Sequence, residues 1–164
     1  MRIICSIAFV LLSATSFAQS FLLKNEELVF SFSTARGKQL VLAKDRENKY
    51  MVYRFGTNDK IEFEFPEKNK LSWTLFTYSF YLRGGAASNE GEDLNYISFT
   101  SNDIKYTIYD TYYAVGNTAS IGVKITDLKT KRTTDIKGIN NTRKGTMVDF
   151  RDNHLLKIAD DLDE

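Results

Sequence analysis

The feature that most narrows the fold of this chain is the alternation of side-chain types in three runs within residues 72–109. One face of residues 73–82 gathers apolar and aromatic side chains, namely Phe76, Tyr78, Phe80 and Leu82. A period of two is typical of a β-strand and does not fit a helix. Residues 94–100 and 103–110 alternate in the same way and are joined at Ser101 and Asn102. The stretch therefore predicts three consecutive strands.

Shorter alternating runs occur on both sides of this stretch. Strands are predicted over residues 28–33, 39–43, 50–55, 60–65 and 119–126, a short return strand over 132–137, and a last strand over 146–150. Gly56 is expected to begin a turn, and Pro66 ends the strand before it. Leu155, Ile158 and Leu162 have helical spacing behind Asp152, a possible N-cap, which predicts one short C-terminal helix.

About nine or ten strands without intervening helices favour an all-β fold. An antiparallel β-sandwich and a small barrel are both compatible with this pattern. A chain of this length can bury roughly two-thirds of its unfolded surface, which is enough for one domain over residues 19–164.

The first 18 residues have the features of a cleaved secretory signal peptide. Arg2 precedes an apolar core over residues 3–12, and Ser16-Phe17-Ala18 has the small-x-small pattern of a cleavage site. The sole cysteine, Cys5, lies near the start of the apolar core rather than at its end, so it is lost with the leader. A periplasmic or secreted protein is the expectation, without disulfides or a lipidated cysteine.

The charge balance excludes some classes of partner. Of the 22 Lys and Arg residues, Arg2 belongs to the leader, so residues 19–164 carry 21 of them against 21 Asp and Glu. A nucleic-acid binder would need a basic excess. The sequence therefore predicts no nucleic-acid partner, and no second apolar run is long enough to span a membrane.

The sequence contains no convincing set of catalytic residues. We therefore predict that the protein is not an enzyme and uses no cofactor. His154 has no Gly-x-Ser-x-Gly partner motif. Glu62 and Glu64 fall on the solvent-exposed face of their strand, while Glu90, Glu92 and Asp93 fall in a loop. Neither setting holds a carboxyl group in the buried position that gives a general acid its raised pKa.

The break between the first two strands, residues 83–93, is polar, contains glycine and is too long for a tight hairpin turn. Asn89, Glu90, Glu92, Asp93 and Asn95 surround Gly91 with oxygen ligands that suit Ca²⁺, but their spacing differs from the twelve-residue calcium loop, so no metal is predicted.

Loops on rigid scaffolds concentrate binding function, and tyrosine and arginine often anchor interfaces. Tyr81, Tyr109, Tyr112 and Tyr113 lie near strand ends and are expected to be exposed. The predicted partner-binding residues are Tyr81, Arg83, Asn89, Glu90, Glu92, Asp93 and Tyr109.

The run Tyr50-Met51-Val52-Tyr53-Arg54-Phe55-Gly56, followed by Ile61-Glu62-Phe63-Glu64-Phe65-Pro66, resembles a family of small, uncharacterised, exported proteobacterial β-proteins. Their pattern is a Tyr-x-x-Tyr-Arg-Phe-Gly strand before a strand that ends in Phe-Pro or Tyr-Pro. The likeness extends over residues 50–150 and includes the Gly-Gly-x-x-x-Asn-Glu-Gly run that begins at Gly84. It implies a shared fold and no particular activity.

A wider analogy links the chain to periplasmic lysozyme inhibitors and to immunity proteins against wall-attacking toxins, which plug an enzyme cleft with a loop. The chain lacks the Ser-Gly-x-x-Tyr loop of the lysozyme inhibitors. The analogy implies a protein partner, a cell-wall hydrolase or toxin, engaged by residues 84–92. Two alternatives stay open: an envelope assembly component that pairs through a strand edge, and a small-ligand barrel with a pocket around Trp73 and residues 76–80.

Overall fold

The computed structural model describes residues 21–162, so the predicted signal peptide lies outside the described residues. The described strands form two sheets, one in the order β10-β1-β2-β3-β4 and one in the order β11-β5-β6-β7-β8-β9. The first sheet contains β1 (Glu26–Ser33), β2 (Gln39–Asp45), β3 (Met51–Thr57), β4 (Lys60–Phe65) and β10 (Lys144–Gly145). The second contains β5 (Thr77–Arg83), β6 (Glu92–Ser101), β7 (Ile104–Tyr113), β8 (Thr118–Asp127), β9 (Thr133–Lys137) and β11 (Lys157–Ile158).

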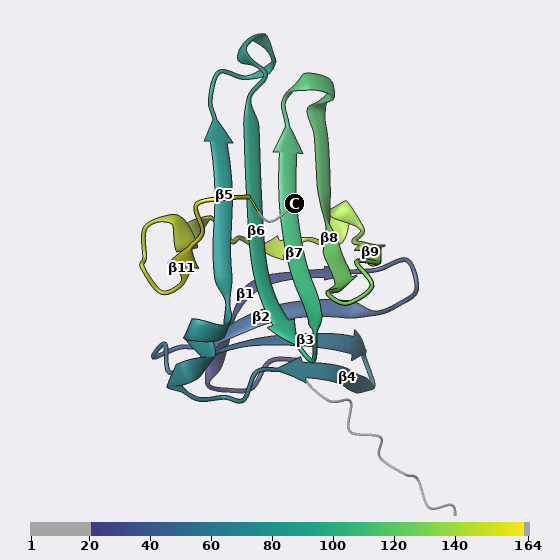
Figure 1. Cartoon of the computed structure of the whole chain (residues 1–164), viewed down its shortest axis with the longest axis vertical. Helices are drawn as coiled ribbons and strands as arrows, with labels where there is room; N and C mark the ends of the chain where they lie inside the picture. Colours follow the sequence, from purple (N-terminus) through teal and green to yellow (C-terminus); the bar gives the residue numbers. More distant parts are fainter. Residues whose placement is uncertain (1–20, 163–164) are drawn as a thin grey trace, which may run out of the picture.

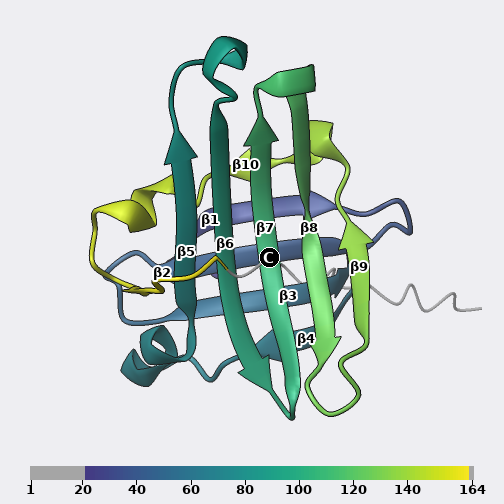
Figure 2. The ribbon, with the colours of Figure 1, turned by 45° about the horizontal axis from the view of Figure 1, so that its top comes forward.

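The two sheets pack face to face with their strands crossing, as Figures 1 and 2 show. The strand pairs are antiparallel except β11, which pairs in parallel with β5. At one corner a single bridge joins Thr34 to Gly138, and the Ile139 amide donates to the Ser33 carbonyl at 2.8 Å. The protein is thus an all-β sandwich, and the all-β prediction is confirmed.

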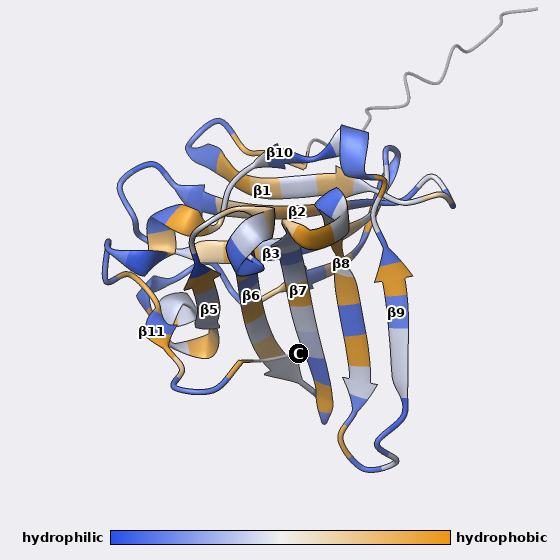
Figure 3. Cartoon of the chain, turned by 90° about the horizontal axis from the view of Figure 1, so that it is seen from above, coloured by the Kyte–Doolittle hydropathy of each residue, from blue (hydrophilic) through white to orange (hydrophobic). Residues whose placement is uncertain are grey.

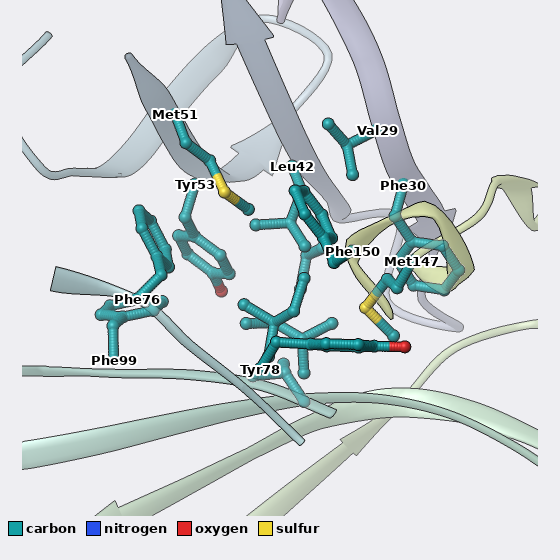
Figure 4. Packing of buried hydrophobic residues seen from close by; sticks show 14 of the residues in the cluster. Val29, Phe30, Leu42, Met51, Tyr53, Phe76, Tyr78, Phe99, Met147 and Phe150 are labelled. Atoms are coloured by element: carbon teal, nitrogen blue, oxygen red, sulfur yellow. The ribbon is translucent and has the colours of Figure 1, made fainter. Parts of the chain in front are cut away.

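The core lies between the sheets and is rich in aromatic rings. Phe99 and Tyr106 of the second sheet stack at 4.8 Å between centroids, and Tyr53 of the first sheet lies 5.1 Å from Phe99. Figure 4 shows Tyr53, Phe76 and Phe99 meeting in this layer. Hydropathy alternates along strands such as β8 in Figure 3, as the period of two requires. Each large apolar side chain buried here stabilises the fold by roughly 1.5–3 kcal/mol.

The predicted strand over residues 73–82 begins later than expected. Residues Lys70–Leu75 form a 3₁₀ helix, η1, and β5 starts only at Thr77. The Asn69 side chain accepts from the Leu71 amide at 2.9 Å and so caps η1, while the Ser72 hydroxyl accepts from the Met51 amide. Local side-chain capping therefore overrides the alternation at Trp73.

The C-terminal predictions were wrong. Instead of a strand over residues 146–150, the chain forms the 3₁₀ helix η5 (Val148–Arg151), and instead of a helix the tail runs extended into β11. His154 has a positive φ of 54° outside any helix. Leu156 is buried in the main core, whereas Leu162 packs on the opposite face of the second sheet. A helix rises only about 1.5 Å per residue, so the residues between Leu156 and Leu162 could not connect the core to the opposite face of the sheet in a helical conformation.

The ends of β5 to β8 extend past the first sheet, as Figure 1 shows at the top of the molecule. We call this region, residues 81–93 and 111–119, the overhang. Two 3₁₀ turns cap its hairpins, η2 (Ala87–Asn89) and η3 (Val115–Asn117). The Ala114 amide donates to the Gly91 carbonyl at 2.8 Å, which joins the two hairpins.

Candidate binding site on the overhang

The register of β5 and β6 divides the predicted site between two faces. Arg83 lies opposite Glu92 and Leu82 opposite Asp93, and directly paired residues share a face of the sheet. Arg83 and Glu92 are therefore on the outer face, and Asp93 is on the inner face, which the first sheet covers lower down. The structure does not bring all seven predicted residues together.

The loop between β5 and β6 is held by its own hydrogen bonds. Arg83 donates from Nε to the Glu90 carbonyl at 2.9 Å and from Nη2 to Glu92 Oε1 at 2.8 Å. The Gly91 amide donates to the Ala86 carbonyl at 2.7 Å. Glu90 has a left-handed φ of 50° and a largely exposed side chain. Arg83 thus shapes the loop, and Glu90 is the acidic side chain that the loop presents to solvent.

Asn89 lies against Gly85 at the base of the same turn. Gly85 has a φ of +107°, and a Cβ added there would lie 2.4 Å from the Asn89 side-chain nitrogen. Both the dihedral angle and the close approach require glycine. This contact ties Asn89 to the structure of the turn.

Large apolar side chains are exposed on the overhang. The most exposed are Leu82 at 58% and Val115 at 57%, and three tyrosines accompany them, Tyr81, Tyr112 and Tyr113. Leu82 and Tyr112 lie on the inner face of the sheet, and Tyr81 and Tyr113 on the outer face. Exposed apolar residues gathered at one end of a molecule are typical of an interaction surface.

Tyr109 does not belong to this exposed group, so the expectation of its exposure was wrong. It is buried with Leu94 and Tyr96 on the outer face, and its hydroxyl donates to Asp135 Oδ1 at 2.9 Å. Burial, together with the carboxylate of Asp135, raises the pKa of Tyr109. Its ring covers Gly122, where a Cβ would meet the phenol oxygen at 2.3 Å, so Tyr109 has a packing role.

The inner face of the same region carries a polar network that we call the inner network, formed by Tyr78, Asp93, Asn95, Asp110, Arg143 and Arg151. The Tyr78 hydroxyl donates to Asn95 Oδ1 at 2.6 Å, and the Asn95 amide donates to Asp93 Oδ1 at 2.7 Å. Arg151 donates to both Asp93 and Asn95. Arg143 Nη1 reaches the two carboxylate oxygens of Asp110 at 2.9 and 3.2 Å.

The two arginines come from residues 138–151, the segment that follows β9 and passes across the inner face of the second sheet beside β1. This closing segment contains η4 (Asn140–Thr142), β10 and η5. Arg151 also lies 5.0 Å from the centroid of the Phe80 ring, a favourable cation–π distance. Its buried Nε has no hydrogen-bond partner among the described residues. The network is therefore not fully satisfied.

Asp110 shows the electrostatic cost of this position. Burial raises its pKa, and the nearby charge and hydrogen bond of Arg143 only partly oppose that effect. The Asp93 carboxylate adds to the rise. A carboxyl group on an otherwise apolar inner face thus pays a desolvation penalty that its partners do not fully remove.

A cavity of about 360 Å³ opens beside the inner network. It is lined by Asp93, Tyr112, Ala119, Ile121, Asn140 and Arg143. Ile121 is buried, whereas Tyr112 is 40% exposed and the Arg143 side chain 48% exposed. The cavity combines an apolar floor with polar groups that solvent can reach.

Sequence reasoning missed most of this network. Asn95 and Asp110 interrupt the apolar side of their strands, since Ile97, Phe99, Tyr106 and Ile108 occupy the same face. That interruption was a usable signal. Arg143 and Arg151 lie in a segment without periodicity, so their approach to these strands could not be read from the pattern.

The residues of the Tyr-x-x-Tyr-Arg-Phe-Gly run form a different network on the outer face of the first sheet. Arg54 is 1% exposed and donates from Nη1 and Nη2 to the two carboxylate oxygens of Glu26 at 2.5 and 2.8 Å. It also donates to Glu64 at 2.6 Å and to the Phe21 carbonyl at 2.8 Å. The Tyr50 hydroxyl donates to Glu26 at 3.0 Å. We call this set the outer network.

The structure also explains why residue 56 is glycine, although Gly56 does not start a turn as predicted. It lies within β3 at a shift of register, and a Cβ there would lie 2.1 Å from the Lys60 carbonyl oxygen. Only glycine allows this approach. The run is thus explained by packing and ion pairing rather than by a binding surface.

The region around Trp73 does not supply the pocket that the ligand-barrel hypothesis required. Phe76 and Tyr78 are fully buried, and Phe150 packs against both Trp73 and Tyr78. Among residues 21–162, no group of His, Cys, Asp and Glu side chains is arranged to hold a metal ion. No helix in this part of the chain has the length and apolar character needed to cross a membrane.

Comparison with known proteins returned no matching family model, curated protein or solved structure.

Proposed function

We propose that this is an exported, non-enzymatic binding protein that uses the overhang to block a protein partner, most concretely a peptidoglycan-active enzyme. The observation that carries the proposal is the exposure of Leu82 and Val115 at the end of two hairpins that extend past the first sheet. Exposed apolar anchors on a stiff projection suit insertion into a concave cleft.

Acidic groups on the outer face of the overhang, opposite the face that carries Leu82, support the same proposal. Glu90 is 73% exposed beside Arg83, and Glu92 lies on the same outer face. Acidic groups near an interface steer a basic partner and raise its rate of association. Because the loop is braced by Arg83 and Gly91, binding requires little further ordering of this segment.

The test measures inhibition by residues 19–164 of a panel of purified enzymes: a muramidase, a lytic transglycosylase, an amidase and an endopeptidase. We expect stoichiometric inhibition of one class on a cell-wall suspension. Leu82→Ser combined with Val115→Ser should weaken this inhibition by about tenfold or more, because truncating an interface anchor commonly costs over 1 kcal/mol.

Leu71→Ser provides the matched control, since Leu71 is 70% exposed but lies on η1, away from the overhang. It should inhibit like the unmodified chain. Failure to inhibit or bind any enzyme of the panel would reject the proposal. Binding that survives the overhang variant but is lost on proline substitution along β9, an edge strand, would instead favour assembly through a strand edge.

A further inference from the structure

The cavity beside the inner network lies on the inner face of the second sheet, and three of its lining residues, Asp93, Tyr112 and Ala119, belong to the overhang. Neither anchor of the proposed function, Leu82 or Val115, lines it. Its volume of about 360 Å³ falls within the range of roughly 300–1,000 Å³ that small-molecule sites occupy. Its walls come from three strands and the closing segment: Asp93 on β6, Tyr112 on β7, Ile121 on β8, and Arg143 in the closing segment.

The charges at this cavity cancel. Asp93 is paired with Arg151, and Asp110 with Arg143. Two carboxylates therefore face two guanidinium groups, and a ligand that carried a net charge would bring an uncompensated charge close to one of these pairs. Such a charge is costly in a partly desolvated site. The chemistry thus favours an uncharged ligand.

Polar groups of both kinds remain available to such a ligand. Arg143 uses Nη1 for Asp110, so Nε and Nη2 have no partner among the described residues. Asn140 donates its amide nitrogen to the Ala119 carbonyl at 2.7 Å, which leaves its amide oxygen as an acceptor. Asp93 is 38% exposed and bonds through Oδ1, so Oδ2 can accept. Fixed donors beside fixed acceptors match a hydroxyl group, which does both.

An aromatic surface completes the lining. Tyr112 is 40% exposed, and its hydroxyl donates to Asn117 Oδ1 at 3.1 Å, which restrains the ring. Ala119 lies directly opposite Tyr112 in the sheet and extends the apolar surface. A flat ring of this kind offers van der Waals contact to a ligand with an apolar C–H face.

We propose that this cavity binds an uncharged saccharide, with Tyr112 under the C–H face of one sugar ring and Asp93, Asn140 and Arg143 bonded to its hydroxyl groups. A saccharide alone combines a dense set of hydroxyls with an apolar ring face and no charge. The inner network then has a function beyond holding the closing segment, because Arg151 and Asn95 orient the Asp93 carboxylate that the sugar contacts.

The experiment is ligand-observed saturation-transfer NMR with residues 19–164, followed by calorimetry. The probes are glucose, galactose, mannose, N-acetylglucosamine, cellobiose and maltose at about 10 mM, tenfold above a Kd of 1 mM. Glucuronic acid and glucosamine serve as charged counterparts. We expect saturation transfer to at least one neutral sugar and weaker binding of both charged sugars.

Three variants locate the site. Tyr112→Ala and Arg143→Lys should each weaken sugar binding by about tenfold, the second because lysine keeps a charge for Asp110 but lacks the planar fork. Tyr113→Ala is the matched control, since Tyr113 is 38% exposed but faces the other side of the sheet. Thermal melts of all three variants exclude unfolding as the cause.

No saturation transfer to any neutral probe would overturn the proposal. Equal affinity of Tyr112→Ala and the unmodified chain, or tighter binding of a charged sugar, would overturn it as well. Because these readouts use no enzyme and leave Leu82 and Val115 intact, they are independent of the enzyme-inhibition test.

Discussion

The outer and inner networks both place arginine against carboxylates, but one is closed and the other is open. In the outer network Arg54 is 1% exposed, and each of its three guanidinium nitrogens donates to a carboxylate. In the inner network Arg143 is half exposed, a buried nitrogen of Arg151 lacks a partner among the described residues, and a cavity borders the set.

The difference in burial and in hydrogen-bond pairing gives the two networks different roles. A buried ion pair whose donors are all satisfied holds segments together, and here it fastens the start of the described chain, at Phe21, to β3. A network with spare donors and solvent access contributes less to stability. It can, however, exchange water for ligand hydroxyls at little cost, because its polar groups are already positioned.

The largest effect is expected from breaking the closed network. Glu26→Ala leaves the buried Arg54 charge without its bidentate partner and should lower the free energy of unfolding by about 3–5 kcal/mol. Urea denaturation followed by circular dichroism measures this loss. Glu62→Ala is the control: it removes an exposed carboxylate paired with Lys38 and should cost at most about 1 kcal/mol. Similar losses for the two variants would contradict the contrast.

A smaller loss is expected when Arg151 is removed from the open network. Arg151→Met keeps an apolar stem beside Phe80 but loses the cation–π contact and deprives Asp93 and Asn95 of a donor. The free energy of unfolding should fall by about 1–3 kcal/mol, less than for Glu26→Ala. A loss as large as that of Glu26→Ala would mean that the inner network is as closed as the outer one.

The two networks should also respond to pH with opposite sign. Burial alone would raise the pKa of Glu26, but the hydrogen bonds and charge of Arg54 bring it below its ordinary value. The stability from Glu26 is therefore present at neutral pH and lost as the pH falls through the folded-state pKa. The pKa of Asp110 is raised, so its contribution is present at low pH and lost as the pH rises through its folded-state value.

Asp110→Asn tests this sign. Relative to the unmodified chain, the variant should gain stability between pH 3 and pH 7, by about 1.4 kcal/mol for each unit by which the pKa is raised. Urea denaturation at several pH values measures the trend. If the variant instead loses relative stability as the pH rises, the Asp110 carboxylate is better compensated than the geometry indicates.

The smallest effect on stability is expected at Arg143. Arg143→Gln removes a half-exposed partner of Asp110, and the free energy of unfolding should change by less than about 1 kcal/mol. Thermal denaturation measures the change, with Lys129→Gln, from the exposed pair with Asp103, as the reference for a surface ion pair. A loss of several kcal/mol would assign Arg143 to the fold rather than to the cavity.

The fold was largely predictable because alternation is a local property. The predicted strand over residues 60–65 coincides with β4, and the predicted joint at Ser101 and Asn102 is off by one residue, since β6 ends at Ser101 and β7 begins at Ile104. Predictions failed where side chains cap the backbone, as at η1, and where apolar residues of an extended tail separate onto two faces, as at Leu156 and Leu162.

The candidate site was predictable only in part. The loop between β5 and β6 projects from the molecule as the sequence predicted. The register of β5 and β6 places Asp93 on one face of the sheet and Arg83 and Glu92 on the other. Tyr109 could not be recognised as buried, because Leu162 and Asp135, which accompany it, lie far away in the sequence.

The sequence by itself determined the strands and the side chains that share each face, since the period of two requires only neighbouring residues. Tertiary structure alone decided which buried charges meet. The 28 residues that separate Glu26 from Arg54 and the 58 that separate Asp93 from Arg151 are bridged by crossing sheets and by the closing segment. Those contacts arise from long-range packing, whose geometry no local pattern encodes.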